Sequence, residues 1–411
     1  KAPAYVWHGD GVRNEDWQEI SFGDGFDVVP MPGDPDMAYA MSQGGNVYRI
    51  HIPTGAMAYI QPNHPDTTEL RYNWNAAIAV DPHDPNGLYF GSQFVHYSSD
   101  RGQSWTVLSP DLTTNDPEKQ KQTESGGLTT DATNAENHTT LLCVTPHPER
   151  PKEVWASSDD GLVHKTVDGG ETWTELSGGL KGLPAGSWIS QVRISPHNPD
   201  EVYITANNYR RNDWSPYLYR SRDGGGKWER IIAEGDVLGH VQCVLQDPEV
   251  EELLWCGTEQ GLWWSHDGGQ EWQRWKEGVP AVPVRDIVLQ ERESDLVLGT
   301  FGRGVYIVDG LEVIRAWVAA GKDDEFGGAA CTMFAPDAAV MAEWRRPAGE
   351  RFPADGYWSA DNKGGGARVR CHFNEDSIEG LAKDEMLLLH MLNSVGDTVR
   401  TMEPEPDGGM G

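Results

Sequence analysis

The chain has 411 residues and a formal net charge of −31 at neutral pH. A surface this acidic repels phosphate groups, and no Lys/Arg-rich run is present, so the composition argues against binding to nucleic acid or anionic lipid. The chain contains 17 Trp against 9 Phe, and its 47 Gly and 26 Pro interrupt it at short intervals. These features favour an all-β protein built from many short strands.

Six repeats succeed one another between Gln18 and Arg315, each of roughly 45 to 65 residues. Each repeat predicts a strand, a proline-bearing turn, a second strand, a short loop, a third strand, a turn and a fourth strand. The stretch VRISPHNPDEVYITANN illustrates the first two strands and the proline-bearing turn between them. Four antiparallel strands per unit at this period are typical of β-propeller blades. We predict six blades, or seven if further chain completes another, near 18–61, 74–109, 137–177, 188–233, 240–276 and 284–315.

Four repeats carry the pattern Ser/Thr-x-Asp-x-Gly-x-x-Trp between the third and fourth strands. Asp and Ser or Thr side chains bond local backbone N–H groups in tight turns, and Gly accepts a positive φ without steric cost. The Trp indole then packs between neighbouring sheets. We therefore predict structural rather than catalytic roles for the Asp and Trp residues of these turns, which are Asp100, Trp105, Asp168, Trp173, Asp223, Trp228, Asp267 and Trp272.

This pattern resembles the Asp-box, or bacterial neuraminidase repeat, of sialidases, two-propeller glycoside hydrolases of the xyloglucanase type and sortilin-type receptors. Longer stretches resemble large secreted bacterial proteins known as sortilin-like or glycosyl-hydrolase repeat proteins, among them GDGFDVVPMPGDPDMAYAMSQGGNVYRIHIPTG and LGTFGRGVYIVDG. In that family two propellers precede a C-terminal β-sandwich. The resemblance spans the chain from about Tyr5 and implies an extracellular or periplasmic protein. With no signal peptide or initial Met present, we expect a mature product or a piece of a longer polypeptide that lacks an upstream propeller.

The pattern changes after Arg315. A linker-like stretch, AAGKDDEFGGAA, precedes segments that predict strands, the last two around a turn at 393–397. We therefore divide the chain into a propeller over 1–315 and a linker with part of a β-sandwich over 316–411. The five cysteines are too few for a disulfide scaffold. Cys243 and Cys256 could face each other across one hairpin, but two unpaired core thiols are the favoured interpretation.

In a propeller, the loops between strands two and three and those between blades meet on one face around the central channel, where a ligand is expected. Aromatic rings supply contact area there, and guanidinium groups supply fixed hydrogen-bond donors. Trp214 is the strongest candidate, because arginines and Asp213 flank it in a long loop. The predicted ligand-binding residues are Arg71, Trp74, Trp188, Arg210, Arg211, Trp214 and Arg303. A sialidase is disfavoured, since the Arg-Ile-Pro signature of that family is absent.

A glycosidase needs two carboxylates, either ~5–5.5 Å or ~6.5–9.5 Å apart. Glu136, Asp159 and Asp213 are the catalytic candidates among the acids on these loops, which also include Asp131, Asp160 and Glu259. Because the chain has 64 acidic residues, carboxylates on loops are expected by chance. The 13 His form no metal-ligand spacing, and no phosphate-binding loop occurs, so we predict no metal and no cofactor.

These observations favour a non-catalytic binding or assembly module with a protein or glycan ligand. The first alternative is a glycoside hydrolase in which this propeller forms one wall of a substrate cleft. The second is a structural subunit of a larger surface complex. A carboxylate pair lining a trough with aromatic platforms would support the enzyme, because a propeller scaffold by itself hosts both enzymes and binding proteins. We expect no membrane span, since no run of 18 apolar residues occurs.

Overall fold

The computed structural model describes residues 3, 5–6, 11–121, 137–320, 331–336, 358–362, 367–373 and 388–403. The chain divides into two compact units: Lys1–Asp309 with Trp344–Asn362, and Gly310–Glu343 with Lys363–Gly411. Two of the acidic residues considered above, Asp131 and Glu136, lie outside the described residues.

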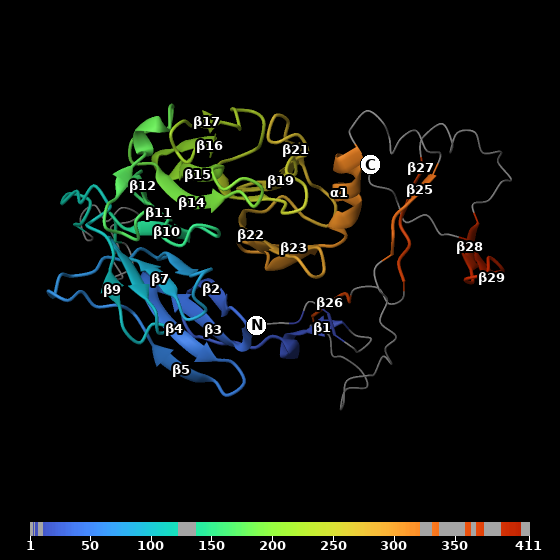
Figure 1. The fold of residues 1–411 in the computed structure, drawn as a ribbon, viewed down its shortest axis with the longest axis horizontal. Helices are drawn as coiled ribbons and strands as arrows, with labels where there is room; N and C mark the ends of the chain where they lie inside the picture. The colour runs from blue at the N-terminus through green and yellow to red at the C-terminus, as the bar shows by residue number, and fades with distance from the viewer. Residues whose placement is uncertain are drawn as a thin grey trace. The chain divides into compact units, whose positions relative to one another are not determined.

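Six antiparallel sheets succeed one another along the described part of the first unit, from blue to orange in Figure 1. The first sheet consists of β2 (Gly25–Met31), β3 (Asp34–Ser42), β4 (Asn46–His51) and β5 (Ala56–Tyr59). The second consists of β6 (Ile78–Val80), β7 (Leu88–Gly91), β8 (Val95–Ser98) and β9 (Thr106–Val107). The third consists of β10 (Leu141–Pro146), β11 (Val154–Ser158), β12 (Val163–Thr166) and β13 (Thr174–Glu175).

The remaining three sheets continue this order. The fourth consists of β14 (Trp188–Ile194), β15 (Val202–Asn208), β16 (Asp213–Ser221) and β17 (Glu229–Arg230). The fifth consists of β18 (Val241–Gln246), β19 (Leu254–Thr258), β20 (Gly261–Ser265) and β21 (Gln273–Arg274), and the sixth of β22 (Val284–Gln290), β23 (Asp295–Thr300) and β24 (Val305–Val308). The expected all-β propeller is confirmed, with six blades.

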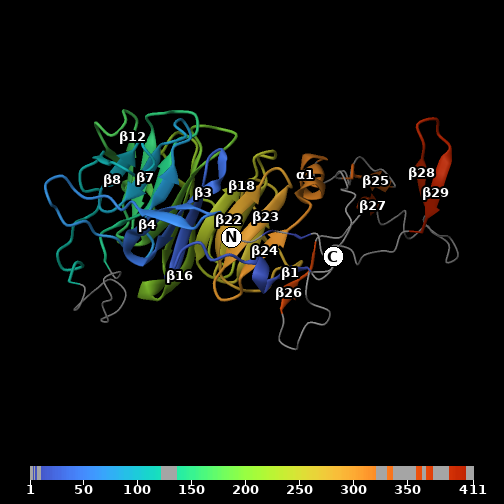
Figure 2. The same ribbon diagram turned by 90° about the horizontal axis from the view of Figure 1, so that it is seen from below.

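Neighbouring blades pack through their innermost strands: β6 contacts β2 and β10, β14 contacts β10 and β18, and β18 contacts β22. The strands β18 and β22 lie side by side in Figure 2. The second strand of a blade is covered on both faces, and β11, β15 and β19 are buried along their whole length. This double burial explains why these strands are almost continuously apolar or small rather than alternating. The core of the unit is the set of interfaces between successive sheets.

Five of the innermost described strands share a register shift near their first residues. The shifts fall between Leu141 and Cys143, Ile189 and Gln191, Val241 and Cys243, Val284 and Asp286, and Gly25 and Val28. A β-bulge inserts an extra residue, increases the local twist and redirects side chains. The inserted residues therefore recur at one level of the propeller, and among them are Asp27, Ser190, Gln242 and Arg285.

The Ser/Thr-x-Asp-x-Gly-x-x-Trp turns are held by local hydrogen bonds. In the second blade, Ser98 Oγ donates to Asp100 Oδ1 at 2.7 Å and accepts from the backbone N–H of Gly102 at 2.7 Å. Asp100 Oδ1 also accepts from the backbone N–H of Ser104 at 2.8 Å. Thr166 and Asp168 repeat this arrangement in the third blade. The carboxylate of each of these two turns is therefore used within its own turn.

These turns also join each blade to the preceding one. The indole N–H of Trp105 donates to the carbonyl of Ile60 at 2.8 Å, and that of Trp173 donates to the carbonyl of Leu108 at 3.1 Å. Ile60 and Leu108 each come directly after the outer strand of the preceding blade, β5 and β9. Trp272 makes the same bond to Ile231 at 3.1 Å. We call each such contact between a turn and the preceding outer strand a blade seam.

The chain leaves the propeller differently from the expectation. The sixth sheet has three described strands rather than four, and helix α1 (Leu311–Ala320) in the second unit comes after them. Its sequence, LEVIRAWVAA, contains no Gly or Pro, and its buried residues Leu311, Ile314 and Arg315 lie on one helical face. No helix in the described part of the chain combines the length and apolar composition needed to cross a membrane.

The second unit also contains two strand pairs, β25 (Cys331–Met333) with β27 (Cys371–Phe373) and β28 (Leu389–Leu392) with β29 (Thr398–Met402). The predicted turn at 393–397 is confirmed, since the backbone N–H of Asn393 donates to the Asp397 carbonyl at 2.9 Å. In the first unit, β1 (Val12–Arg13) pairs with β26 (Ser359–Ala360).

Cys243 and Cys256 are buried free thiols, which confirms the favoured interpretation. Cys243 lies opposite Gly257, whereas Cys256 lies opposite Val244, so the two cysteines are offset by one residue. An offset of one places their side chains on opposite faces of the sheet.

Candidate functional site

The loop between the second and third strands of the fourth blade is held in shape by Asp213. After β15 the chain makes a short 3-10 turn over Tyr209–Arg211, and Asn212 then takes a left-handed conformation with φ 60°. The Asp213 carboxylate accepts hydrogen bonds from Asn208 Nδ2 at 3.1 Å and from the Tyr217 hydroxyl at 2.8 Å. Although burial alone would raise it, these bonds and one from Ser215 hold the pKa of Asp213 below its usual value. Asp213 is therefore an ionised anchor for the loop rather than an acid.

Side chains of this loop stack in a row with Trp188 of β14 and with the buried His240, which precedes β18. The guanidinium carbon of Arg210 lies 3.4 Å from the ring centroid of Trp188 and 4.4 Å from that of Tyr209. Tyr209 in turn stacks on His240, with centroids 4.5 Å apart and ring planes at 21°. Trp214 completes the row at 5.8 Å from Tyr209 and is 50 % exposed. We call these five residues the ring row; cation–π contacts of this kind hold its arginine in place.

A small cavity of about 70 Å³ opens beside the ring row, and it is lined by His138, Gly186, Trp188, Asn207, Asn208, Arg210 and Arg211. A cavity of this size has room for water molecules or for the hydroxyl group of a ligand. The lining supplies amide and guanidinium donors, which suit an oxygen-rich ligand.

Asp159 lies behind this cavity and is fully buried. Its carboxylate accepts hydrogen bonds from Asn73 Nδ2 at 2.8 Å and from the backbone N–H and hydroxyl of Thr140 at 2.9 and 2.7 Å. Burial, together with the negative charge of Asp160, raises the pKa of Asp159 to about 7 although these bonds oppose the shift. His138 Nδ1 lies 3.6 Å from Asp159 Oδ1. No substrate reaches a carboxylate so enclosed, and Asp159 therefore positions its neighbours.

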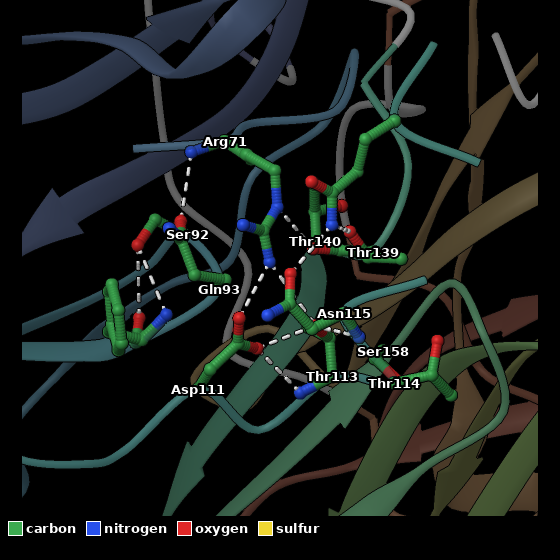
Figure 3. Close-up of polar contacts among 12 residues, drawn as sticks. Arg71, Ser92, Gln93, Asp111, Thr113, Thr114, Asn115, Thr139, Thr140 and Ser158 are labelled. Carbon is green, nitrogen blue, oxygen red and sulfur yellow. Dashed lines mark hydrogen bonds and ion pairs between the residues drawn. The ribbon is translucent and has the colours of Figure 1, made fainter. Parts of the chain in front are cut away.

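Arg71 is bound within the protein. Its guanidinium lies 2.8 Å from the Asp111 carboxylate, and its Nε donates to the carbonyl of Thr139 at 3.2 Å (Figure 3). The backbone N–H of Arg71 donates to the side chain of Gln93 at 2.9 Å. Arg71 therefore ties together two of the loops that join successive blades, and its donors are used in doing so.

The predicted ligand-binding residues thus separate into two groups. Trp188, Arg210, Arg211 and Trp214 come together at the ring row and its cavity. Arg71 is tied to Asp111, Trp74 packs on Phe26 with centroids 6.2 Å apart, and Arg303 is exposed between β23 and β24.

The innermost strands carry a charged group that sequence reasoning missed. Arg193 in β14 lies 3.8 Å from the carboxylate of Asp286 in β22. Burial and the charge of Asp286 raise the pKa of Asp27, in β2, to about 6, while a hydrogen bond from Asn75 opposes the shift. Burial also raises the pKa of Asp286, and the charge of Arg193 opposes this shift.

Asp27, Arg193 and Asp286 come from the first, fourth and sixth blades, so they meet across the centre of the propeller. Only loop residues were expected to carry chemistry. A charge within an otherwise apolar innermost strand, as in FDVV, QVRI and RDIV, is the signal that could have found this group. Within the described ranges, no group of three or more His, Cys, Asp or Glu side chains is arranged to hold a metal ion.

Three buried histidines make stability depend on pH. Burial above all lowers the pKa of His96, His138 and His240 to about 4. In the unfolded chain a histidine binds a proton below about pH 6.5. Between these values the unfolded state holds more protons, so this contribution to stability falls as pH decreases from about 6.5 to about 4. Asp27 and Asp159, with raised pKa values, act in the opposite direction.

We expect the His96→Phe variant to lose less stability than the unmodified protein between pH 7 and pH 4.5, because the variant lacks one of these three groups. Urea unfolding at the two pH values measures the difference. The His390→Gln change, which removes an exposed histidine outside this buried group, serves as the control. Equal pH dependence in the His96→Phe variant and the unmodified protein would contradict the prediction.

The sequence relatives of the chain are xyloglucanases. A xyloglucanase of Acetivibrio thermocellus is 29 % identical over 133 residues, which is 29 % of this chain and 16 % of the relative. A probable oligoxyloglucan-reducing end-specific xyloglucanase of Neosartorya fischeri is 24 % identical over 218 residues, and one of Emericella nidulans is 23 % identical over 212 residues. In both cases the match covers 50 % of this chain and 23 % of the relative. No protein-family model matches the chain.

Solved structures with a similar fold include the GH74 xyloglucanase of Xanthomonas campestris, at a TM-score of 0.44 and 15 % identity. The match covers 72 % of this chain and 54 % of the enzyme. The extracellular domain of a putative hybrid two component system of B. thetaiotaomicron matches at a TM-score of 0.48 and 12 % identity, over 71 % of this chain and 34 % of that one.

The favoured interpretation, a non-catalytic binding or assembly module, is therefore wrong: the sequence relatives are hydrolytic enzymes and agree with the first alternative. A propeller scaffold with carboxylates scattered over its loops is common to enzymes and binding proteins, so these sequence features do not distinguish the two. The conditional expectation that an enzyme of this kind would be a glycoside hydrolase is confirmed. The chain is a six-bladed propeller whose sequence relatives are glycoside hydrolases.

Proposed function

We propose that this chain is part of a glycoside hydrolase that cleaves a neutral polysaccharide, with xyloglucan as the first candidate substrate. The observation that carries the proposal is the ring row beside its small polar cavity. The sequence relatives are xyloglucanases, which supports glycoside hydrolysis as the reaction and xyloglucan as the polysaccharide to test first. The matched segments are only 16 % and 23 % of the relatives' lengths, and in this proposal the propeller accordingly forms one wall of the substrate cleft.

The ring row binds the sugar chain. The exposed face of Trp214 stacks on the C–H face of a pyranose ring, and Tyr209 extends the platform beneath it. Arg211 and the amide groups of Asn207 and Asn208 line the cavity and bind hydroxyl groups. Trp and Tyr lose little conformational freedom on binding, so this platform is an efficient one.

Asp27 and Asp286 perform the chemistry. Asp27 is protonated below about pH 6 and donates its proton to the glycosidic oxygen as the bond to the anomeric carbon breaks. Asp286 lies 3.8 Å from Arg193, whose charge opposes the effect of burial on its pKa, and its carboxylate removes a proton from the water that adds to that carbon.

The proposal includes several finer assignments. The turn geometry at Asp100 and Asp168 supports membership of the Asp-box repeat proteins and the likeness to the sortilin-like group. The acidic composition and the xyloglucanase relatives support an extracellular or periplasmic location. The change of sequence pattern after Arg315 supports a division into a propeller over 1–315 and a linker with part of a β-sandwich over 316–411.

The test is release of reducing ends from xyloglucan by the full chain, with the anionic polysaccharide polygalacturonate as a negative control. We expect the Trp214→Ala variant to raise KM for xyloglucan at least about tenfold with little change in kcat, because stacking stabilises the ground state and the transition state alike. Phe22→Ala, which removes an 88 % exposed ring outside both cavities, is the matched control. No release from xyloglucan, or an unchanged KM for Trp214→Ala, would exclude the proposal.

A further inference from the structure

A second cavity, of about 380 Å³, lies at the seam between the first and second blades. Its lining comes from the end of β5 and from the turn that precedes β9, and comprises Tyr59, Ile60, Gln61, Asn63, Gly102, Gln103, Ser104 and Trp105. We call it the seam groove. The ring row belongs to the fourth and fifth blades, so the two sites share no residue.

The seam groove is lined without charge. None of its lining residues is Asp, Glu, Lys or Arg, although such residues make up 24 % of the chain and the net charge is −31. Its polar groups are side-chain amides and hydroxyls, and its apolar surface is mainly two aromatic rings. Rings for C–H faces together with neutral donors and acceptors for hydroxyls are the groups that bind an uncharged sugar.

The other blade seams do not share this composition. At the position of Tyr59, directly before the seam residue of the outer strand, the later seams have Val107, Glu175 and Arg230. At the two turn positions before the Trp, where the seam groove has Gln103 and Ser104, they have Glu171 with Thr172, Gly226 with Lys227, and Gln270 with Glu271. Every later seam therefore carries at least one charged residue at these positions, and none has an aromatic ring in place of Tyr59.

The groove is also held in shape before any ligand arrives. Tyr59 is 54 % exposed, packs on Tyr48 with ring centroids 5.2 Å apart, and donates its hydroxyl to Gln61 Oε1 at 2.5 Å. Gln61 Nε2 donates to the carbonyl of Gly45 at 2.9 Å. On the opposite side, Ser104 Oγ donates to Asp100 at 2.6 Å. Fixed side chains lower the entropy lost on binding.

We propose that the seam groove is a second carbohydrate-binding site, which holds a neutral oligosaccharide segment away from the ring row. Tyr59 stacks on one sugar ring, the face of Trp105 forms the floor, and Gln61, Gln103 and Ser104 bind hydroxyls. The site contains none of the groups assigned to hydrolysis, so its existence does not rest on the proposed function. If this site and the proposed hydrolase both exist, the seam groove keeps the polysaccharide bound while a distant segment of the same polymer is bound at the ring row and cleaved.

The test is isothermal titration with soluble xyloglucan and with polygalacturonate, for the Trp214→Ala variant alone and combined with Tyr59→Ala. We expect Tyr59→Ala to weaken xyloglucan binding at least about tenfold in this background, because the exposed stacking ring is lost. Gln103→Glu is also expected to weaken xyloglucan binding. It introduces into the seam groove the negative charge that Glu171 has at the equivalent position of the next seam. Phe22→Ala in the same background is the control and leaves binding unchanged.

The outcomes separate this proposal from the function. If xyloglucan is bound in a Tyr59-dependent way but never cleaved, the site stands and the proposed hydrolase fails. If xyloglucan is cleaved, but adding Tyr59→Ala or Gln103→Glu to the Trp214→Ala variant does not weaken xyloglucan binding, the second site is excluded. Equal binding of polygalacturonate would also overturn the proposal, because the neutral lining would then have no selective effect. Circular dichroism of each variant excludes unfolding as the cause.

Discussion

Replacing Asp27 with Asn is expected to lower kcat for xyloglucan hydrolysis by at least about a hundredfold, the smaller end of what loss of a general acid costs. The amide has the size of the carboxyl group but cannot donate a proton to a departing sugar. Because Asp27 does not belong to the ring row, which binds the sugar chain in the proposal, KM for xyloglucan is expected to change little. Initial rates of reducing-end release over a range of xyloglucan concentrations measure both constants.

The pH profile gives this prediction a second readout. In the proposed mechanism Asp27 must be protonated, and its pKa is raised to about 6, so activity is expected to fall as the pH rises through this value. The negative charge of Asp286 is one of the causes that raise the pKa of Asp27. Asp286→Asn removes that charge, lowers the pKa of Asp27 and shifts the alkaline limb of any remaining activity to lower pH. A purely structural role for Asp27 would leave the position of this limb unchanged.

A matched control lies three residues earlier. Asp24→Asn makes the same chemical change on an exposed side chain at the start of the same blade and is expected to retain full activity. If Asp27→Asn hydrolyses xyloglucan as fast as the Asp24→Asn variant, the general acid lies elsewhere and Asp27 has a structural role only.

Replacing Gly170 with Ala is expected to lower the free energy of unfolding by about 2 kcal/mol or more beyond the loss caused by Gly169→Ala. A Cβ on Gly170 would lie 2.4 Å from the carbonyl oxygen of Leu108, a backbone atom of the preceding blade. The turn would have to withdraw from the seam, which would weaken the bond from Trp173 to the same carbonyl. Urea unfolding at constant pH measures the loss.

Gly169 is the appropriate control because it shares the backbone strain but not the contact. Its φ is +81° and that of Gly170 is +99°, so both substitutions place an L residue in a left-handed conformation. The nearest atom to a Cβ on Gly169 is Lys152 Cγ at 3.9 Å, an ordinary contact with a flexible side chain. Similar losses for the two variants would show that the seam yields readily and that the strain dominates.

The sequence predicts the propeller well because its determinants are local. The Ser/Thr-x-Asp-x-Gly-x-x-Trp turns close through bonds between residues at most four apart, as Thr166, Asp168 and Gly170 show. The strand spacing around them results from alternating apolar segments and proline-bearing turns. The ring row was also partly foreseen, since Trp214 and its arginines lie close together in one loop.

Other features depend on register and on residues distant in the chain. Cys243 and Cys256 lie at similar distances from the turn between β18 and β19, which suggested that they face each other. The strand register offsets them by one residue instead. The surroundings of Asp159 include Asn73, from the loop between the first and second blades, whose amide donates a hydrogen bond to its carboxylate. The participation of His240 in the ring row depends on how the fourth and fifth blades pack.

By itself, the sequence determined the fold class, the number of blades to within one and the turns, because hydrogen bonding and side-chain periodicity within each repeat specify them. Only the tertiary structure decided which charges meet. Asp27, Arg193 and Asp286 stand far apart in the chain and come together because six sheets direct their innermost strands to one channel. There the shared low-dielectric surroundings set the proton affinity of each carboxylate, which no local sequence pattern encodes.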